Sequence, residues 1–214
     1  MSSFADWINH KRHNRGYGVQ SPSAFFFVTQ VLREKLPYYA YEELDNITTE
    51  CGEMKKRASR RLFRIANYTA PTNAIIVGSI TAACAISNAR RKIPKLLLTE
   101  STTMPTEAAG NLEACNCIHK AGDTLQLLKE SLGKGNTIGM LYIGQCSQQK
   151  EMLEAALEYT GKESIIIVEG IHRSKEWWQH VIANPKAIVT YDMFSMGILF
   201  FDKEKQKQNY TLKL

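Results

Sequence analysis

From residue 73 onward, short apolar runs alternate with stretches of helical periodicity, and this alternation limits the chain to few folds. We predict strands at 74–77, 95–99, 117–119, 138–143 and 164–168, and helices at 81–91, 106–115, 124–132, 148–159 and 174–184. Strands that are apolar throughout are buried on both faces, and the helices between them return the chain to the same end of the sheet. The pattern therefore predicts a parallel sheet covered by helices on both faces.

The last part of the chain differs, because its two strands, 187–191 and 197–201, follow each other closely. Residues 192–196 are too few for a helical crossover, so the two strands must pair antiparallel as a hairpin. The predicted fold class is α/β: a Rossmann-like parallel sheet with a closing antiparallel hairpin, helices on both faces and an N-terminal helical extension. We expect residues 1–70 to form a helical segment packed on an α/β domain of residues 71–214.

The N-terminal extension has two clear helix signals. Ser21 and Pro22 are suited to the cap and first turn of a helix, which Pro37 ends. A second helix is predicted at 54–68, with its apolar side chains inward and its arginines largely outward. The inward residues are Leu62, Ile65 and Ala66, and the outward ones are Arg57, Arg60, Arg61 and Arg64.

Composition narrows the class of protein further. The 214 residues are 44% apolar and 22% charged, which excludes a wholly disordered, collagen-like or disulfide-scaffold chain. The five cysteines include no Cys-x-x-Cys motif, so neither a zinc ribbon nor a thioredoxin-type redox pair is indicated. No apolar run approaches the roughly 20 residues of a membrane span, and no signal-peptide pattern opens the chain. We expect a cytoplasmic protein without a membrane partner.

Net charge is +6, from 27 Lys and Arg against 21 Asp and Glu. A basic surface on the N-terminal helices could hold a phosphate-bearing partner such as nucleic acid. The same charges could equally form a solvated helix face, and no nucleic-acid motif accompanies them. The aromatic C-terminal hairpin could form the interface of a homodimer.

Polar residues follow three of the predicted strands at the edge where ligands of open α/β sheets bind. Gly78 and Ser79 follow the first strand, Glu100 the second, and Gly122 and Asp123 the third. A glycine allows close approach of a ligand, and the helix after it offers free N–H groups. An acid at the second position commonly accepts hydrogen bonds from a ribose. Together the three positions suit one nucleoside laid across adjacent strand ends.

Each of these residues also has a structural interpretation. Gly78 can be a turn glycine, Glu100 a solvated carboxylate, and Asp123 the N-cap of the next helix.

The order of these elements resembles the class I S-adenosylmethionine-dependent methyltransferase fold, which is marked by a closing antiparallel hairpin on an otherwise parallel sheet. More narrowly, the chain resembles a group of bacterial methyltransferase-like proteins, typified in Bacteroidetes and related to the O-methyltransferases. The resemblance is carried by residues 19–25, 60–68, 98–100, 121–123, 171–174 and 189–201. It implies that Gly78 and Ser79 lie under the methionine part of the cofactor. It also implies that Glu100 holds the ribose, and Gly122 and Asp123 the adenine edge.

Several residues depart from the family's pattern. Ile76 stands where the family has an acid, and Ala82 where it has a second glycine. Loss of a charge-assisted hydrogen bond costs about 1.5–3 kcal/mol, so we expect S-adenosylmethionine binding to be weak or lost. Gly144 and Gly170 stand where related enzymes place acids, which are often metal ligands. We therefore expect no metal site.

Two residues near the fifth strand could act in catalysis. His172 is a candidate base, since an imidazole titrates near neutral pH, and Glu169 is the remaining carboxylate. Alternatively, His172 is a structural loop histidine, and Glu169 pairs with Arg173 or Lys175. Trp177 and Trp178 could wall an acceptor pocket, or one could pack on the sheet with the other half exposed.

The functional hypothesis is a metal-independent, S-adenosylmethionine-dependent O- or N-methyltransferase whose acceptor the sequence does not identify. The alternative is a methyltransferase-like binding or interaction module that has lost its chemistry, because function depends on the site and not on the fold.

Overall fold

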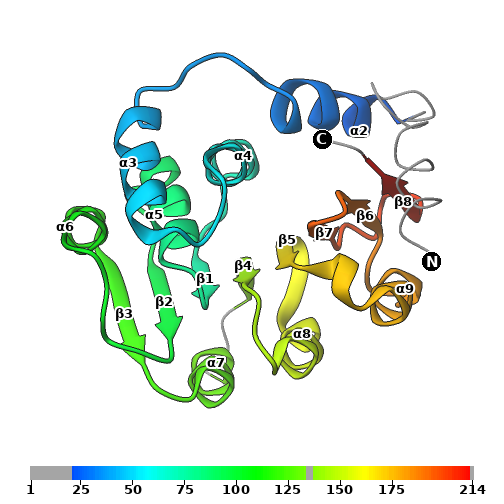
Figure 1. Ribbon diagram of the computed structural model, residues 1–214. Coiled ribbons are helices and arrows are strands. Elements are labelled where there is room, and N and C mark those ends of the chain that lie inside the picture. Colours follow the sequence, from blue (N-terminus) through cyan, green and yellow to red (C-terminus); the bar gives the residue numbers. More distant parts are fainter. Residues whose placement is uncertain (1–20, 134–136, 213–214) are drawn as a thin grey trace.

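The computed structural model describes residues 21–133 and 137–212, and an eight-stranded sheet organises them (Figure 1). In chain order the strands are β1 (Ala74–Val77), β2 (Lys95–Thr99), β3 (Cys117–Ala121), β4 (Ile138–Ile143), β5 (Thr160–Glu169), β6 (Val189–Asp192), β7 (Met196–Phe200) and β8 (Gln208–Thr211). Their spatial order is β3-β2-β1-β4-β5-β7-β6-β8. Strand β7 runs antiparallel to both β5 and β6, and all other neighbours are parallel. This confirms the predicted α/β class and its closing hairpin.

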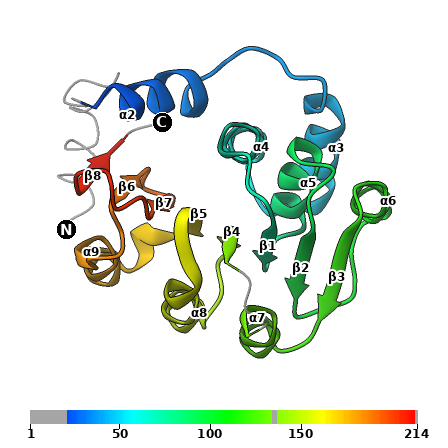
Figure 2. The same ribbon diagram turned by 180° about the vertical axis from the view of Figure 1, so that it is seen from behind.

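Helices cover both faces of the sheet (Figures 1 and 2). One face carries α2 (Pro22–Phe26), a π-helix (Phe27–Leu32), α3 (Tyr41–Cys51), α4 (Lys56–Thr69), α5 (Ile80–Ala89) and α6 (Thr106–Ala114). The other carries α7 (Thr124–Leu132), α8 (Gln149–Ala156) and α9 (Lys175–Ala183). Short 3-10 turns lie at Leu157–Tyr159 and Ile171–Arg173.

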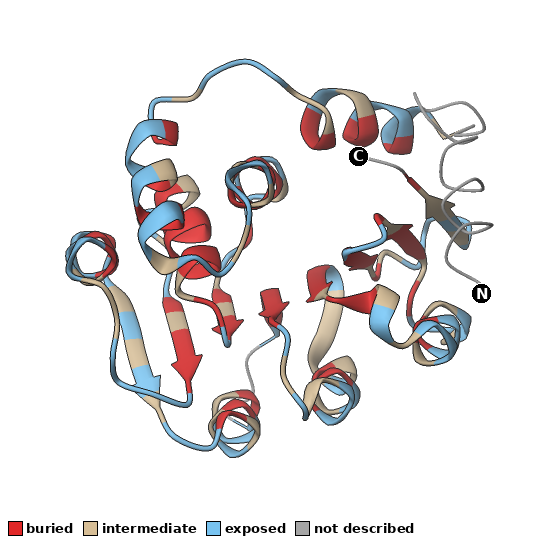
Figure 3. Cartoon of the chain, viewed as in Figure 1, coloured by how far each residue is buried: buried red, intermediate tan, exposed pale blue. Residues whose placement is uncertain are grey.

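Two cores follow from this layering, because successive side chains of a strand point to opposite faces. Ile76 and Tyr142 belong to the core beneath the N-terminal helices, while Val77 and Ile143 belong to the core above α7–α9. The central strands are buried along their length (Figure 3). The continuous apolar runs of the sequence therefore arise from burial on both faces.

Two elements were not predicted. Helix α3 follows a tyrosine-rich segment, and strand β8 has the polar sequence Gln-Asn-Tyr-Thr. Strand β8 pairs parallel with β6 at the sheet edge, with Gln208 N donating to Ile188 O at 2.8 Å and Leu212 N to Asp192 O at 2.7 Å. Backbone pairing at the edge does not require an apolar pattern, so the sequence gives little sign of this strand.

The predicted outward position of the α4 arginines is wrong for Arg61 and Arg64. These side chains are buried, whereas Arg57 is exposed and Arg60 pairs with Asp45. Burial lowers the pKa of Arg61 to about 10, so its guanidinium is still charged at neutral pH. The basic surface is therefore smaller than predicted, and residues 1–20, which hold part of it, lie outside the described residues.

Arg64 can be buried because its guanidinium donates hydrogen bonds to three acceptors. Nε donates to Val31 O at 2.6 Å, Nη2 to Leu32 O at 3.0 Å, and Nη1 to the Tyr41 hydroxyl at 3.0 Å. The two carbonyls belong to the last turn of the π-helix, where intrahelical donors run out. Arg64 thus ties the N-terminal helices to α4.

The described cysteines are all free, which agrees with the predicted lack of a disulfide framework. Among the described residues, no helix is long and apolar enough to cross a membrane.

We predict that Arg64→Met lowers the free energy of unfolding by roughly 3 kcal/mol or more, because two carbonyls and a hydroxyl lose a charged donor in a buried position. Urea unfolding measures the change. Arg57→Met is the matched control on the same helix, and its exposed side chain predicts a change within about 0.5 kcal/mol. Equal losses in the two variants would contradict the assigned role of Arg64.

Candidate functional site

The strand order reverses between β1 and β4, so the carboxyl ends of these strands flank the crevice where α/β proteins bind ligands. Gly78 follows β1 with a φ of 74°, and a Cβ there would meet no atom within 4 Å. The backbone at Gly78 is thus open to close approach. Ser79 is buried and caps α5, its Oγ accepting a hydrogen bond from Ala82 N at 3.1 Å.

A carboxylate that the sequence analysis missed, Glu53, also lies at the start of α5. Its Oε2 accepts hydrogen bonds from Ser79 Oγ at 2.7 Å and Thr81 N at 2.9 Å, and its Oε1 accepts one from Ile80 N at 3.2 Å. Gly52, with a φ of 66°, ends α3 and turns the chain toward this position. A Gly-Glu pair after a helix is common in protein sequences. It therefore gives no sign that Glu53 contacts residues 26 to 28 positions later in the chain.

The ends of β2 and β3 bring the predicted nucleoside-binding residues together. Thr99 of β2 pairs with Ala121 of β3, so Glu100 and Gly122 are the next residues at neighbouring strand ends. Glu100 and Asp123 are exposed. Asp123 also caps α7, with Oδ1 accepting from Gln126 N at 3.0 Å, so the structural interpretation of this residue is confirmed. Its second carboxylate oxygen has no hydrogen bond to the described residues.

Glu169, at the end of β5, is partly buried and forms a hydrogen bond with a tyrosine. The fully buried Tyr142 hydroxyl donates to Glu169 Oε2 at 2.8 Å. Burial raises the pKa of Glu169 above its ordinary value, and the Tyr142 hydrogen bond and the charge of Arg173 only partly oppose this. The predicted pairing with Arg173 is therefore no more than a long-range attraction.

His172 lies in the 3-10 turn after β5 and stacks on Phe194, with ring centroids 4.8 Å apart and planes 14° apart. Its Nδ1 is buried and has no hydrogen-bond partner. Phe194 lies in the tight β6–β7 turn with a φ of 68°. The structure thus shows a packing contact for His172 and no hydrogen bond between it and Glu169.

At both glycines that replace acids a side chain would meet close neighbours, which are backbone atoms at Gly144 and the flexible Gln145 side chain at Gly170. A Cβ on Gly144 would lie 2.9 Å from Val77 O, and a Cβ on Gly170 3.1 Å from the Gln145 side chain. The Gln149 amide bridges the two strand ends, donating to Gly144 O at 2.8 Å and Glu169 O at 2.7 Å. The ends of β4 and β5 are therefore joined by backbone contacts and by the neutral amide of Gln149.

The two tryptophans of α9 differ in exposure, as in the predicted alternative in which one packs on the sheet and the other is half exposed. Trp178 is buried, and a Cβ on Gly197 of β7 would collide with its ring. Trp177 is partly exposed and lines a hollow of about 470 Å³ at the β4 and β5 ends. Lys150 and Arg173 also line this hollow.

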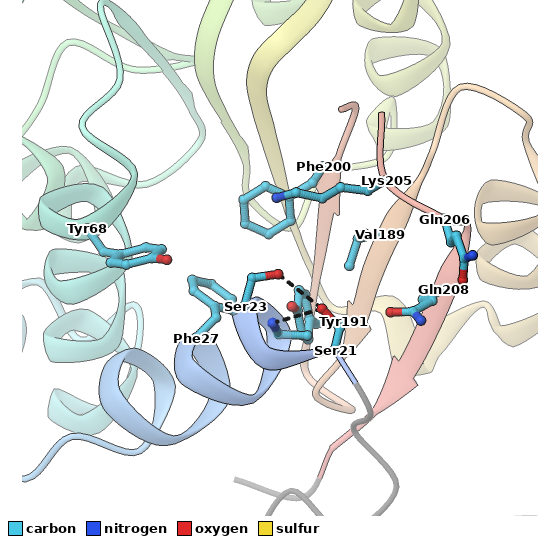
Figure 4. Close-up of a pocket in the computed structure, with 11 residues that line it drawn as sticks. Ser21, Ser23, Phe27, Tyr68, Val189, Tyr191, Phe200, Lys205, Gln206 and Gln208 are labelled. Carbon is cyan, nitrogen blue, oxygen red and sulfur yellow. Dashed lines mark hydrogen bonds between the residues drawn. The ribbon is translucent and has the colours of Figure 1, made fainter. Parts of the chain in front are cut away.

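A separate cavity of about 410 Å³ lies between the N-terminal helices and the far end of β6–β8 (Figure 4). Its walls include Phe27, Tyr68, Tyr191 and Phe200. None of the predicted site residues lines it, so it is not part of the candidate site.

Comparison with known proteins supports the fold but does not show to which protein family the chain belongs. No protein-family model matches the sequence, and no curated protein does. Among solved structures, the chain is similar to an O-methyltransferase from Bacillus cereus in complex with SAH (13% identity, TM-score 0.59, 81% of this chain and 95% of that one). It is also similar to a methyltransferase from Geobacter sulfurreducens (14% identity, TM-score 0.61, 81% and 96%). An SAH-bound methyltransferase from Podospora anserina is another (10% identity, TM-score 0.62, 85% and 96%).

We predict a pH-dependent effect of Glu169→Gln. Because the pKa of Glu169 is raised above the ordinary value of 4.5, the folded state holds this proton more tightly than the unfolded state. Wild-type stability therefore falls as pH rises from the ordinary to the raised pKa, whereas Gln does not titrate. The stability of Glu169→Gln relative to wild type should rise over this interval and then level off. Urea unfolding at a series of pH values measures it.

The control is Glu163→Gln, which replaces an exposed carboxylate on the same strand and measures the effect of the substitution itself at the protein surface. A constant difference between Glu169→Gln and wild type at all pH values would show that the raised pKa of Glu169 is wrong.

Proposed function

We propose that this chain binds an adenosyl compound across the carboxyl ends of β1, β2 and β3, as an S-adenosylmethionine-dependent methyltransferase would. The observation that carries the proposal is the row formed by Gly78, Glu100 and Asp123 at adjacent strand ends. Gly78 offers open backbone, and the other two offer exposed carboxylates suited to the ribose hydroxyls and the adenine amino group. The folds of methyltransferases with bound cofactor products support the same placement.

The residues present fit the adenosyl end of the cofactor better than its amino-acid end. Gly122, with a φ of 150°, adds a turn beside Asp123 that leaves the strand end uncovered. By contrast, Ile76 and Ala82 are fully buried in the core and offer no polar group to the crevice. The cofactor would supply the methyl group, and the chain's own residues would supply mainly position.

For the acceptor we propose the hollow beside Trp177. Lys150 and Arg173 make its lining positive, so an acceptor with an aromatic ring and an anionic group suits it. His172 and Glu169 are the proposed base residues. Glu169 would take a proton readily because of its raised pKa.

A second candidate function is a binding or interaction module without catalysis. The buried Ile76 and Ala82 favour it, because neither residue offers a polar group to the amino-acid end of the cofactor.

We predict that wild-type protein binds S-adenosylhomocysteine no more tightly than the micromolar range, measured by calorimetric titration. Glu100→Ala should weaken this binding about tenfold, because a charge-assisted hydrogen bond contributes about 1.5–3 kcal/mol. Glu107→Ala, an exposed acid in the first turn of α6, is the control and should bind as wild type does. Submicromolar affinity that Glu100→Ala leaves unchanged would refute the assignment.

We also predict that no divalent ion binds between the ends of β4 and β5. Mg²⁺ needs near-octahedral oxygen coordination, usually with one or two carboxylates, and these strand ends offer glycines at 144 and 170 and the single carboxylate of Glu169, which the Tyr142 hydroxyl already binds. Addition of Mg²⁺ should leave the melting temperature unchanged, and any methyl transfer should persist with a chelator. Stoichiometric Mg²⁺ in the purified protein, or activity lost to the chelator, would show the prediction to be wrong.

A further inference from the structure

The first three residues of α5 already have hydrogen-bond acceptors from the chain itself for their N–H groups. The first N–H groups of a helix lack intrahelical acceptors. Here Ile80 N and Thr81 N donate to Glu53, at 3.2 and 2.9 Å. Ala82 N donates to Ser79 Oγ, whose own hydrogen is donated to Glu53 at 2.7 Å. The helix therefore begins with its anion-binding groups saturated by a tethered carboxylate.

This position matters because α5 follows β1 at the reversal of strand order. The N-terminus of such a helix is where an anionic part of a ligand binds in open α/β sheets. In S-adenosylmethionine the only anionic group is the carboxylate of its amino-acid tail. That carboxylate would meet the carboxylate of Glu53 instead of free N–H groups.

A second carboxylate lies nearby on the next strands of the sheet. Glu169 Oε2 accepts the Tyr142 hydroxyl at 2.8 Å, and β1, β4 and β5 are neighbours. Ile76 of β1 pairs with Tyr142 of β4, and Tyr142 pairs with Ile167 of β5. Glu169 and the β1–α5 turn that Glu53 binds therefore lie at the ends of these strands, at the same edge of the sheet. The negative charge of Glu53 raises the pKa of Glu169. Among the residues that the structure describes, neither Glu53 nor Glu169 forms an ion pair. A positive group placed between them would relieve their repulsion.

We infer that the crevice is selective for adenosyl thioethers or sulfonium compounds whose tail carries an amine and no free carboxylate, and that Glu53 is the specificity-determining residue. An ammonium group would face two carboxylates, whereas a carboxylate would face like charge and no free donor. The inference rests on the proposed function, because it assumes that the adenosyl group binds at Gly78, Glu100 and Asp123. It extends that function by naming which tail the site accepts.

The test compares three ligands that share the adenosyl group and differ only in the tail. They are S-adenosylhomocysteine, its aminopropyl analogue that lacks the carboxylate, and methylthioadenosine, which has neither charge. Calorimetric titration of the wild-type chain should give the tightest binding for the aminopropyl analogue, because S-adenosylhomocysteine carries the same ammonium group beside a carboxylate and methylthioadenosine carries neither charge. We expect the aminopropyl analogue to bind about tenfold more tightly than S-adenosylhomocysteine.

Glu53→Ala should reverse this preference. S-adenosylhomocysteine should bind to Glu53→Ala about tenfold more tightly than to wild type, and the aminopropyl analogue should bind more weakly than to wild type. The affinity for methylthioadenosine should not change. Glu53→Gln keeps the size and a hydrogen-bonding oxygen but not the charge, so it should weaken binding of the aminopropyl analogue. It should strengthen binding of S-adenosylhomocysteine less than Glu53→Ala does, because the helix donors stay occupied. Glu50→Ala, an exposed acid on α3, is the matched control and should behave as wild type. If melting shows that Glu53→Ala does not fold, the result of Glu53→Gln decides.

The outcomes separate the two proposals. If methylthioadenosine binds and Glu100→Ala weakens it, but S-adenosylhomocysteine is the preferred ligand of both wild type and Glu53→Gln, the inference is overturned and the proposed function stands. If none of the three ligands binds to wild type or either Glu53 variant, both fail.

Discussion

The close pairing of β1 with β4 at the centre of the sheet is the constraint on which the rest of this structure depends. A Cβ on Gly139 would lie 2.6 Å from Asn73 O, and one on Gly144 would lie 2.9 Å from Val77 O, so β4 has a glycine at both ends of the pair. Asn73 fastens the lower end, donating to Thr137 O and accepting from Gly139 N, both at 3.0 Å. These contacts fix where the strand order reverses, and the proposed ligand site lies at this reversal.

The same constraint explains why the crevice has two unlike halves. On the β2 and β3 side, Glu100 and Asp123 end their strands in the open and can face a nucleoside. On the β4 and β5 side, Gly144 packs on backbone and Gln149 bridges the strand ends. Glu53 and Glu169 lie near this half, where hydrogen bonds from Ser79 and Tyr142 hold them, and Lys150 and Arg173 line the hollow beside it. The candidate site thus has exposed carboxylates at the β2 and β3 ends and charges of both signs around the β4 and β5 ends, an arrangement that a motif comparison based on β1 alone does not reveal.

The N-terminal helices support this arrangement from above. Arg64 joins the π-helix to α4, and α4 ends before the strand that leads to Gly78. Phe27 of the π-helix packs on Tyr191 and Phe200, with ring centroids 5.0 and 5.4 Å away. One layer of helices therefore spans the sheet from the crevice side to the closing hairpin. The loop that carries Glu53 lies between two of its members, so its position depends on the packing of this whole layer.

The sequence by itself determined the elements whose pattern is local. Continuous apolar runs placed strands β1, β2, β4 and β5, a short connection imposed the β6–β7 hairpin, and strand ends pointed to Gly78, Glu100 and Asp123. Only the tertiary structure decided the contacts between distant residues. It buried Arg61 and Arg64 against the outward prediction, added β8 through backbone pairing, and brought Glu53 to a helix that begins 27 residues later. The physical reason is that periodicity reports which face of an element is buried, whereas the partner of a single polar side chain depends on how elements far apart in sequence pack together.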